Sequence, residues 1–330
     1  MKTTKFRAAT VHDKAYVLDF CKNTFSWGDY IDRVWDIWIR EPNSLFLVAV
    51  NVNENKIEKP IAISHGILIP EKIIWIEGIR VDPKHRSHKL ATNLSLHMLN
   101  YARKNGALYS SAIVSIKNEA SKGLMEKLGF KVISTWSYLS IKPIDLLPEL
   151  KNFTIDNSTT TKVANLNEYQ LILNFLKQSN IFNTSGKKFV NSWRWYDLTE
   201  DKLRMMINNK QVIILVNNDD DDDSNNQEEK EENKIRGIAI IDEEGYWNNQ
   251  NILQFIYIEA DSDELLVLLI IKSLEWITSK ANKNYKKKYH ENKYERVQIF
   301  SPSPIKENSL IFQKFNVNFS EQFLLYHKRI

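Results

Sequence analysis

The stretch IIWIEGIRVDPKHRSHKLATNL, residues 73–94, decides the fold of the first part of the chain. Its opening segment, 73–81, is rich in β-branched and aromatic residues and predicts a buried strand. Pro83 marks a turn, and apolar residues at helical spacing follow from Leu90 to Ala102. The stretch therefore predicts a strand, a turn and a helix, in that order.

Cationic or titratable side chains surround this turn: Lys84, His85, Arg86 and Lys89. The first N–H groups of a helix have no intrahelical partner, and the helix dipole favours negative charge there. One interpretation is therefore a site for an anion such as a phosphate group. The alternative is a basic loop that keeps the helix start solvated.

The pattern extends outward from this stretch into a complete domain, residues 1–142. Its predicted elements are helices at 10–22 and 32–39, strands at 44–50, 61–69 and 73–81, the helix from Leu90, a strand at 111–116, a helix at 119–128 and a strand at 135–141. Helices, antiparallel strands and then a βαβ unit predict an α/β domain with a mixed sheet.

A second domain, 162–330, repeats this plan after a predicted linker at 143–161, which is rich in Pro, Asn, Ser and Thr. The segments MEKLGF (125–130) and FQKFNV (312–317) hold the same place in the two plans, which indicates a degenerate internal duplication. The second domain lacks the basic turn. Its corresponding segment, YIEADSDELL (257–266), is acidic and would repel phosphate.

Composition limits the possible partners. The chain has 330 residues, 43% of them hydrophobic, and a formal net charge of +4, which is too small to indicate nucleic acid or membrane binding. The first residues lack the apolar core of a signal peptide, and the apolar run 265–271 is too short to span a bilayer. The lone Cys21 lies among apolar residues and predicts a buried thiol in a reducing compartment. We expect a cytoplasmic location.

Two charged runs have plain interpretations. The acidic run NNDDDDDSNNQEEKEEN (217–233) predicts a solvated loop rather than a metal site, because it cannot bury apolar surface. The lysine-rich run KANKNYKKKYHENKYER (280–296) interleaves aromatics with positive charge, as single-strand nucleic-acid sites do. Its bases lie in one Asn-rich connection, so a solvated loop is favoured. We expect neither a metal nor a nucleic-acid partner.

The turn resembles the acetyl-coenzyme A (acetyl-CoA) loop of the GCN5-related N-acetyltransferase (GNAT) superfamily. That family has V-x-P followed by R/Q-x-x-G-x-G/A on a strand that leads into a helix. Val81, Pro83, Arg86 and Ala91 match this pattern, and Lys89 occupies the first glycine position.

A second landmark of the family is an Asn after the next strand, followed by a helix that ends L-Y-E-K-L-G-F. The chain has Asn118 and then LMEKLGF at 124–130, with Met125 in the place of the tyrosine. The resemblance implies a GNAT fold, N-acetyltransferase activity and acetyl-CoA as cosubstrate. The expected cofactor contacts are Ile79, Arg80, Val81, Arg86, Ser87, His88, Lys89, Leu90, Ala91, Asn118 and Ser121.

A narrower resemblance implies the acceptor. The segments FSWGDYIDRVWDIWIREP (25–42) and IEGIRVDP (76–83) are similar to segments of histidine N-acetyltransferase-like proteins. This resemblance implies that the acceptor is the amine of a small molecule or amino acid. The candidate acceptor residues are Trp27, Asp29 and Tyr30.

Two interpretations of Asp29 stay open. Its carboxylate could pair with a cationic acceptor between the two aromatic rings. Alternatively it caps the helix that starts near Ile31.

Acetyl transfer to an amine needs a base, because amines are mostly protonated at pH 7. Glu77, in an otherwise apolar strand that leads to the turn, is the candidate; the alternative is a structural pair with Arg80. Met125 cannot protonate the departing thiolate, so Tyr138, water or no acid serves that step. Lys89 and Met125 favour the alternative function, a non-catalytic protein that binds acetyl-CoA or a partner.

Overall fold

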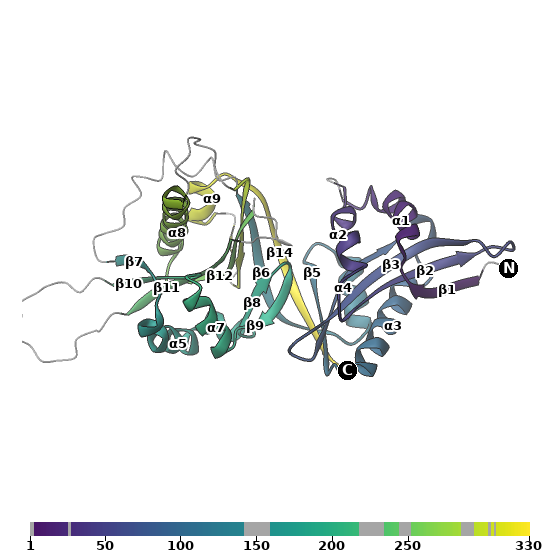
Figure 1. Ribbon diagram of the computed structural model, residues 1–330, viewed down its shortest axis with the longest axis horizontal. Coiled ribbons are helices and arrows are strands. Elements are labelled where there is room, and N and C mark those ends of the chain that lie inside the picture. The colour runs from purple at the N-terminus through teal and green to yellow at the C-terminus, as the bar shows by residue number, and fades with distance from the viewer. Residues whose placement is uncertain are drawn as a thin grey trace, which may run out of the picture. The chain divides into compact units, whose positions relative to one another are not determined.

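The structure, a computed structural model, divides the chain into two compact units (Figure 1). Unit 1 comprises Met1–Val132 and Leu325–Ile330, and unit 2 comprises Ile133–Leu324. The structure describes residues 3–25, 28–141, 159–217, 234–243, 252–284, 294–302, 305–306 and 308–330. The predicted linker up to 158, the acidic run from 218 and the centre of the lysine-rich run (285–293) lie outside the described residues.

Unit 1 is built on a mixed sheet. Its strands are β1 (Thr3–Ala8), β2 (Ser44–Val52), β3 (Glu58–Ile69), β4 (Ile73–Val81) and β5 (Tyr109–Ser115). They lie in chain order, and a further strand, β14 (Val317–Arg329), follows β5. The first four strands pair antiparallel, whereas β4 and β5 are parallel, as expected for strands joined by a helix.

Helices cover both faces of this sheet: α1 (Lys14–Cys21), α2 (Ile31–Trp38), α3 (Leu90–Lys104) and α4 (Glu119–Lys127). The helix α3 lies on the face opposite α1 and α2 (Figure 1). In α2, the residues Ile31, Val34, Trp35 and Trp38 are all buried, and their spacing places them on one side of the helix. Cys21 is also buried, as predicted, and its burial, together with the nearby Asp29 charge, raises the pKa of the thiol to about 12.

The last residues of the chain complete unit 1. In this part of β14, Leu325 and Tyr326 are buried. The backbone N–H of Ile330 donates to Leu108 O (3.0 Å), and the Lys328 ammonium donates to Leu128 O. The strand that closes the first domain therefore comes from the far end of the sequence.

Unit 2 has its own mixed sheet, in the order β6-β13-β12-β11-β10-β7, with β14 beside β6. Its strands are β6 (Lys131–Ile141), β7 (Thr159–Val163), β10 (Val212–Asn217), β11 (Ile235–Asp242), β12 (Ile252–Ala260) and β13 (Arg296–Ser301), and a hairpin is formed by β8 (Lys188–Asn191) and β9 (Arg194–Asp197). Its helices are α5 (Tyr169–Gln178), α6 (Asn180–Thr184), α7 (Glu200–Asn208), α8 (Asp263–Asn284) and α9 (Leu310–Lys314).

The two units share one topology. In each, four antiparallel strands lead through a helix, α3 or α8, to a fifth strand that is parallel to the fourth. The helices α8 and α9 lie on one face of the second sheet and α5 and α7 on the other (Figure 1). The repeated plan inferred from the sequence is thus present in the strand order.

The assignment of two strands differs from the sequence-based boundaries. The predicted final strand of the first domain, 135–141, pairs with β13 and belongs to unit 2. The strand β14 runs from unit 2 into unit 1. Tertiary pairing decides which sheet each of these strands joins, and nothing local to either segment specifies it.

No helix in the described parts of the chain is long and apolar enough to cross a bilayer.

Candidate active site

A bulge interrupts β4 where Glu77 lies. His65 of β3 pairs with Glu77, but Ile63, two residues before His65, pairs with Arg80, three residues after Glu77, so β4 carries one extra residue. Gly78 takes up the bulge with φ +64°, and an added Cβ would clash with the indole of Trp38. A glycine is needed here both for the backbone conformation and for the space.

Beyond this point β4 separates from β5. The two strands pair only at Ile73–Trp75 and Tyr109–Ser111, and β4 then runs on to Val81 with no further pairing to β5 among the described residues. We call this part of the two strands the β4–β5 opening. Glu77 lies two residues after Trp75, so strand alternation places both side chains on the same face of the sheet.

The turn after β4 leaves helix N–H groups available. Asp82 accepts a hydrogen bond from the Lys84 N–H (3.0 Å) and so starts a short 3₁₀ turn. Ser87 and Lys89 then have positive φ values of 66° and 58°, and Lys89, the N-cap of α3, gives that helix no side-chain cap. Arg86 is exposed beside the uncapped helix start. These features fit a pyrophosphate group, which the family's acetyl-CoA would supply.

Lys89 occupies the conformation that glycine adopts most readily. A left-handed φ is unfavourable for lysine, which explains why the family pattern has glycine at this position. Arg86–Ala91 therefore lie together as predicted, at one turn and one helix start. Their contact with acetyl-CoA stays a prediction.

The second landmark forms a helix cap. Asn118 is the N-cap of α4, and its Oδ1 accepts a hydrogen bond from the Ser121 N–H (3.0 Å). Met125, in the family's tyrosine position, is buried. The structure therefore gives Asn118 and Ser121 a local structural role, and their predicted contact with acetyl-CoA stays untested.

Glu77 belongs to a cluster with a histidine and a second carboxylate. His65 Nδ1 lies 2.9 Å from Glu77 Oε1, and His65 Nε2 lies 3.5 Å from Glu41 Oε2, longer than a well-formed hydrogen bond. The His65 side chain is fully buried, and the indole of Trp38 stacks on it with ring centroids 4.5 Å apart. The three side chains also bring donor atoms within 4.8 Å of one another, a set that a cation could use. The predicted absence of a metal stays a prediction.

The Asp29 carboxylate is engaged by neighbouring donors. It accepts hydrogen bonds from Arg80 Nε (2.7 Å) and Nη2 (3.1 Å) and from the N–H groups of Tyr30 (2.7 Å) and Ile31 (3.3 Å). These contacts support a structural role for Asp29 at the start of α2, and its predicted contact with an acceptor stays untested. Arg80 is held by Asp29, and its expected contact with the cofactor stays a prediction.

The environment of Arg80 keeps it charged. Burial alone would lower the pKa of its guanidinium, but Tyr30 and the Asp29 carboxylate raise that pKa above its ordinary value. The rings of Phe25 and Tyr30 lie 5.2 and 5.1 Å from the guanidinium carbon. Burial likewise raises the pKa of Tyr30. Trp27, the other predicted acceptor residue, lies outside the described residues.

Tyr138 is a core residue of unit 2. It is buried on β6 among Trp193, Phe300 and Phe319, and its hydroxyl accepts a hydrogen bond from Gln298 (3.0 Å). Burial raises the pKa of the Tyr138 hydroxyl. Because the strand that carries it belongs to the other unit, the proposed mechanism does not use Tyr138.

Sequence reasoning missed His65, Glu41 and a third group, His327. His327 Nδ1 lies 2.8 Å from Ser111 Oγ, at the last pair of the β4–β5 ladder. The sequence does contain a signal for His65. If β3 and β4 pair regularly from the turn between them, His65 lies opposite Glu77. The partners of Glu41 and His327 depend on tertiary packing and leave no local pattern.

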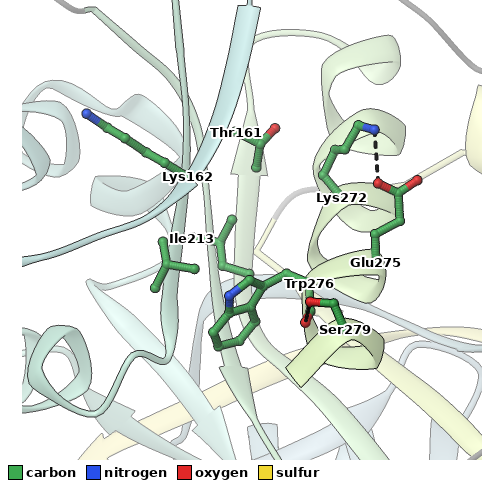
Figure 2. A pocket seen from close by; sticks show the side chains of 8 residues that line it. Thr161, Lys162, Ile213, Lys272, Glu275, Trp276 and Ser279 are labelled. Atoms are coloured by element: carbon green, nitrogen blue, oxygen red, sulfur yellow. Dashed lines mark hydrogen bonds and ion pairs between the residues drawn. The ribbon is translucent and has the colours of Figure 1, made fainter. Parts of the chain in front are cut away.

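A separate cavity of about 310 Å³ lies in unit 2 between α8 and the strands β7 and β10. Figure 2 shows the Trp276 indole beside Ile213, and an ion pair between Lys272 and Glu275 (2.9 Å) at the helix. The cavity contains none of the predicted site residues, and its charged side chains are in ion pairs, Lys272 with Glu275 and Lys162 with Glu168.

Comparison with known proteins agrees with this geometry. Residues 13–130 match the model of the acetyltransferase (GNAT) family. The matched range contains the bulge, the turn and both landmarks. A search of curated proteins gave no match.

Solved structures extend the likeness of fold to the whole chain. A GCN5-related N-acetyltransferase from Sphaerobacter thermophilus is 12% identical, with 99% of this chain and 95% of that chain covered and a TM-score of 0.59. A GCN5-related glucosamine N-acetyltransferase region of a fungal multi-domain GH3 β-N-acetylglucosaminidase is 9% identical, with 99% and 38% covered and a TM-score of 0.56. At such identities the similarity concerns the fold, so the chain has a mixed α/β, GNAT-type fold.

Proposed function

We propose that unit 1 is an acetyl-CoA-dependent N-acetyltransferase that acetylates the amine of a small molecule or amino acid. The observation that carries the proposal is the position of Glu77. This carboxylate lies at the β4 bulge, on the edge of the β4–β5 opening, on the strand that leads directly to the uncapped start of α3.

Each part of this arrangement has a task. The uncapped N–H groups at Leu90 and Ala91, with Arg86 beside them, would hold the pyrophosphate. The backbone at Ile79, released from the regular ladder by the bulge, would polarise the acetyl carbonyl. Acetyl-CoA supplies an acetyl group on a thioester.

Glu77 would take the proton from the acceptor ammonium. The amine nitrogen then bonds to the acetyl carbon, the carbon–sulfur bond breaks and the coenzyme leaves as a thiolate, which takes up, directly or through water, the second proton that the nitrogen loses as the amide forms. A thiolate is a good leaving group, so this step needs no protein acid. Such a mechanism accommodates Met125 in place of the family's tyrosine.

A histidine-like acceptor is supported only by the resemblance of residues 25–42 and 76–83. Asp29 is engaged by Arg80, which favours its structural role over a contact with the acceptor. The acceptor class is therefore proposed as a primary amine, with histidine as the first compound to test.

A second candidate function is a protein that binds acetyl-CoA without catalysis. Lys89 favours it, because its Cβ stands where the family pattern has glycine, close to the expected pyrophosphate. Buried Met125 favours it too, because it removes the family's tyrosine.

The purified chain, incubated with acetyl-CoA and a pool of amino acids that includes histidine, separates the two functions. Mass spectrometry of the pool should show an amino acid that has gained one acetyl group. Glu77→Gln should lower this rate about 100-fold or more while acetyl-CoA affinity, measured by calorimetry, stays unchanged. The matched control is Glu54→Gln, at an exposed residue between β2 and β3, which should act as the wild type.

Binding of acetyl-CoA with no acetylated product would support the non-catalytic function. Equal activity in Glu77→Gln and wild type would remove Glu77 from the mechanism. Arg86→Ala should weaken acetyl-CoA binding and reduce its salt dependence, and unchanged binding would exclude the turn as the pyrophosphate site.

A further inference from the structure

We propose that His65 is a positioning residue for this acetyl transfer: from the neighbouring strand it holds the Glu77 carboxylate at the edge of the β4–β5 opening, and Glu41 and Trp38 fix the imidazole. The inference rests on the proposed function, because it concerns the base of that reaction. It adds three residues to the site, His65, Glu41 and Trp38, that lie outside both family landmarks.

The register of the β3–β4 hairpin brings the two side chains together. His65 and Glu77 are direct cross-strand partners immediately before the bulge, so both side chains point to the face that α2 covers. The 2.9 Å separation of Nδ1 and Oε1 requires one shared proton. With Glu77 ionised and ready to act as a base, that proton is on Nδ1.

The imidazole has little freedom to turn away. Its side chain is fully buried, the Trp38 indole stacks on it at an interplanar angle of 3°, and the Phe46 ring meets it edge-on at 5.8 Å. Rotation of the ring would have to displace buried aromatic side chains. The hydrogen bond to Glu77 is therefore preformed before any acceptor arrives.

Glu41 faces the opposite ring nitrogen. Its Oε2 lies 3.5 Å from Nε2, so the two carboxylates occupy opposite sides of one imidazole. The three side chains also bring one donor atom each within 4.8 Å of one another, a set that a cation could use. The positioning role assigned to His65 rests on its short Nδ1–Oε1 contact with Glu77 and on its buried, stacked ring.

A base must be held closely in place to be effective. A displacement of about 1 Å at a reacting group can lower a rate by about 100-fold, because the groups are then no longer held in the geometry of the reaction. The Glu77 side chain is 12% exposed and has three rotatable bonds, which the hydrogen bond to His65 restricts. The loss of this hydrogen bond should lower kcat and leave the acetyl-CoA KM unchanged.

Two substitutions separate the ring nitrogens of His65. In His65→Asn the amide nitrogen takes the place of Nδ1 and can still donate to Glu77. In His65→Gln the amide reaches the place of Nε2, on the Glu41 side, and the donor to Glu77 is lost. Both remove the imidazole, so a purely structural role would make them equivalent.

The assay is the acetyl-CoA and amino-acid reaction described above, with thermal unfolding as the measure of folding. We expect His65→Gln to lower kcat about 10- to 100-fold and His65→Asn to stay within about threefold of the wild type, with the same acetyl-CoA KM throughout. The control, His97→Gln, changes an exposed histidine on α3, the opposite face of the sheet, and should have no effect.

Equal kcat values for the Asn and Gln variants would overturn the inference while leaving the acetyltransferase function intact. A wild-type chain that acetylates no amine would instead overturn the proposed function, and the inference with it. Should either variant fail to fold, nitrogen NMR of the wild-type imidazole decides: a proton on Nδ1 that depends on Glu77 supports the inference, and a ring protonated at Nε2 alone refutes it.

Discussion

Glu259→Gln should remove a large pH dependence from the stability of unit 2. Glu259 is 3% exposed on β12, and this burial raises the pKa of its carboxyl from 4.5 to about 7. The hydrogen bond that Ser179 donates to it (2.7 Å) lowers the pKa, but by less than burial raises it. Between these two pH values the folded state retains a proton that the unfolded state has released. The free energy of unfolding of the wild type therefore falls as pH rises from about 4.5 to about 7 and is level above that.

The size of this effect follows from the shift. A change from 4.5 to about 7 corresponds to about 3 kcal/mol at about 1.4 kcal/mol per unit. Glutamine keeps the shape and does not ionise, so the variant should match the protonated wild type near pH 4.5 and exceed its stability by about 3 kcal/mol near pH 8.

Urea unfolding of both chains, followed across this pH range, measures the difference. A suitable control is Glu264→Gln, because Glu264 is an exposed carboxyl whose pKa is lowered by hydrogen bonds to backbone and to Ser262. Removing this carboxyl should change the pH dependence of the free energy of unfolding slightly and in the opposite direction. A wild type and Glu259→Gln with parallel pH profiles would refute the argument from burial.

Three further substitutions test the site by thermal or urea unfolding. Gly78→Ala should destabilise unit 1 by at least about 2 kcal/mol, because alanine is strained at φ +64° and its Cβ would clash with Trp38; an unchanged midpoint would mean that the bulge relaxes freely. Asp29→Asn should lower the free energy of unfolding by about 3 kcal/mol, because the buried Arg80 guanidinium loses its counter-charge. An effect on acceptor KM without loss of stability would contradict the structural role of Asp29. Lys89→Gly should stabilise the chain by about 0.5–1 kcal/mol, because glycine adopts a positive φ without strain. It should also weaken the salt dependence of acetyl-CoA binding, because one positive charge is removed. A lower melting temperature of the variant would argue against strain at this turn.

The elements around residues 73–94 were predictable because their signals are local. Apolar alternation, Pro83 and the helical spacing after Leu90 each specify structure within a few residues. The family landmarks are equally local. They led to the helix start at Leu90 and to the helix that follows Asn118.

The site beyond these signals depends on packing. The two interpretations of Asp29 could be separated only once Arg80 was known to lie against it, although the two are far apart in sequence. Tyr138 has the residue type that the missing acid needs, but its strand belongs to the other unit. Likewise nothing in the sequence near Glu41 indicates that it faces a histidine on β3.

The origin of the strand that closes unit 1 has a consequence for biosynthesis. Residues 1–132 leave the ribosome well before Leu325–Ile330, and synthesis of the residues between them takes about 10–40 s at 5–20 residues per second. During that interval β5 has an unpaired edge, which is prone to pair with other chains. The first unit to be synthesised therefore cannot finish folding first. A nascent chain arrested before Leu325 should bind chaperones through this edge, whereas one that extends past Ile330 should not.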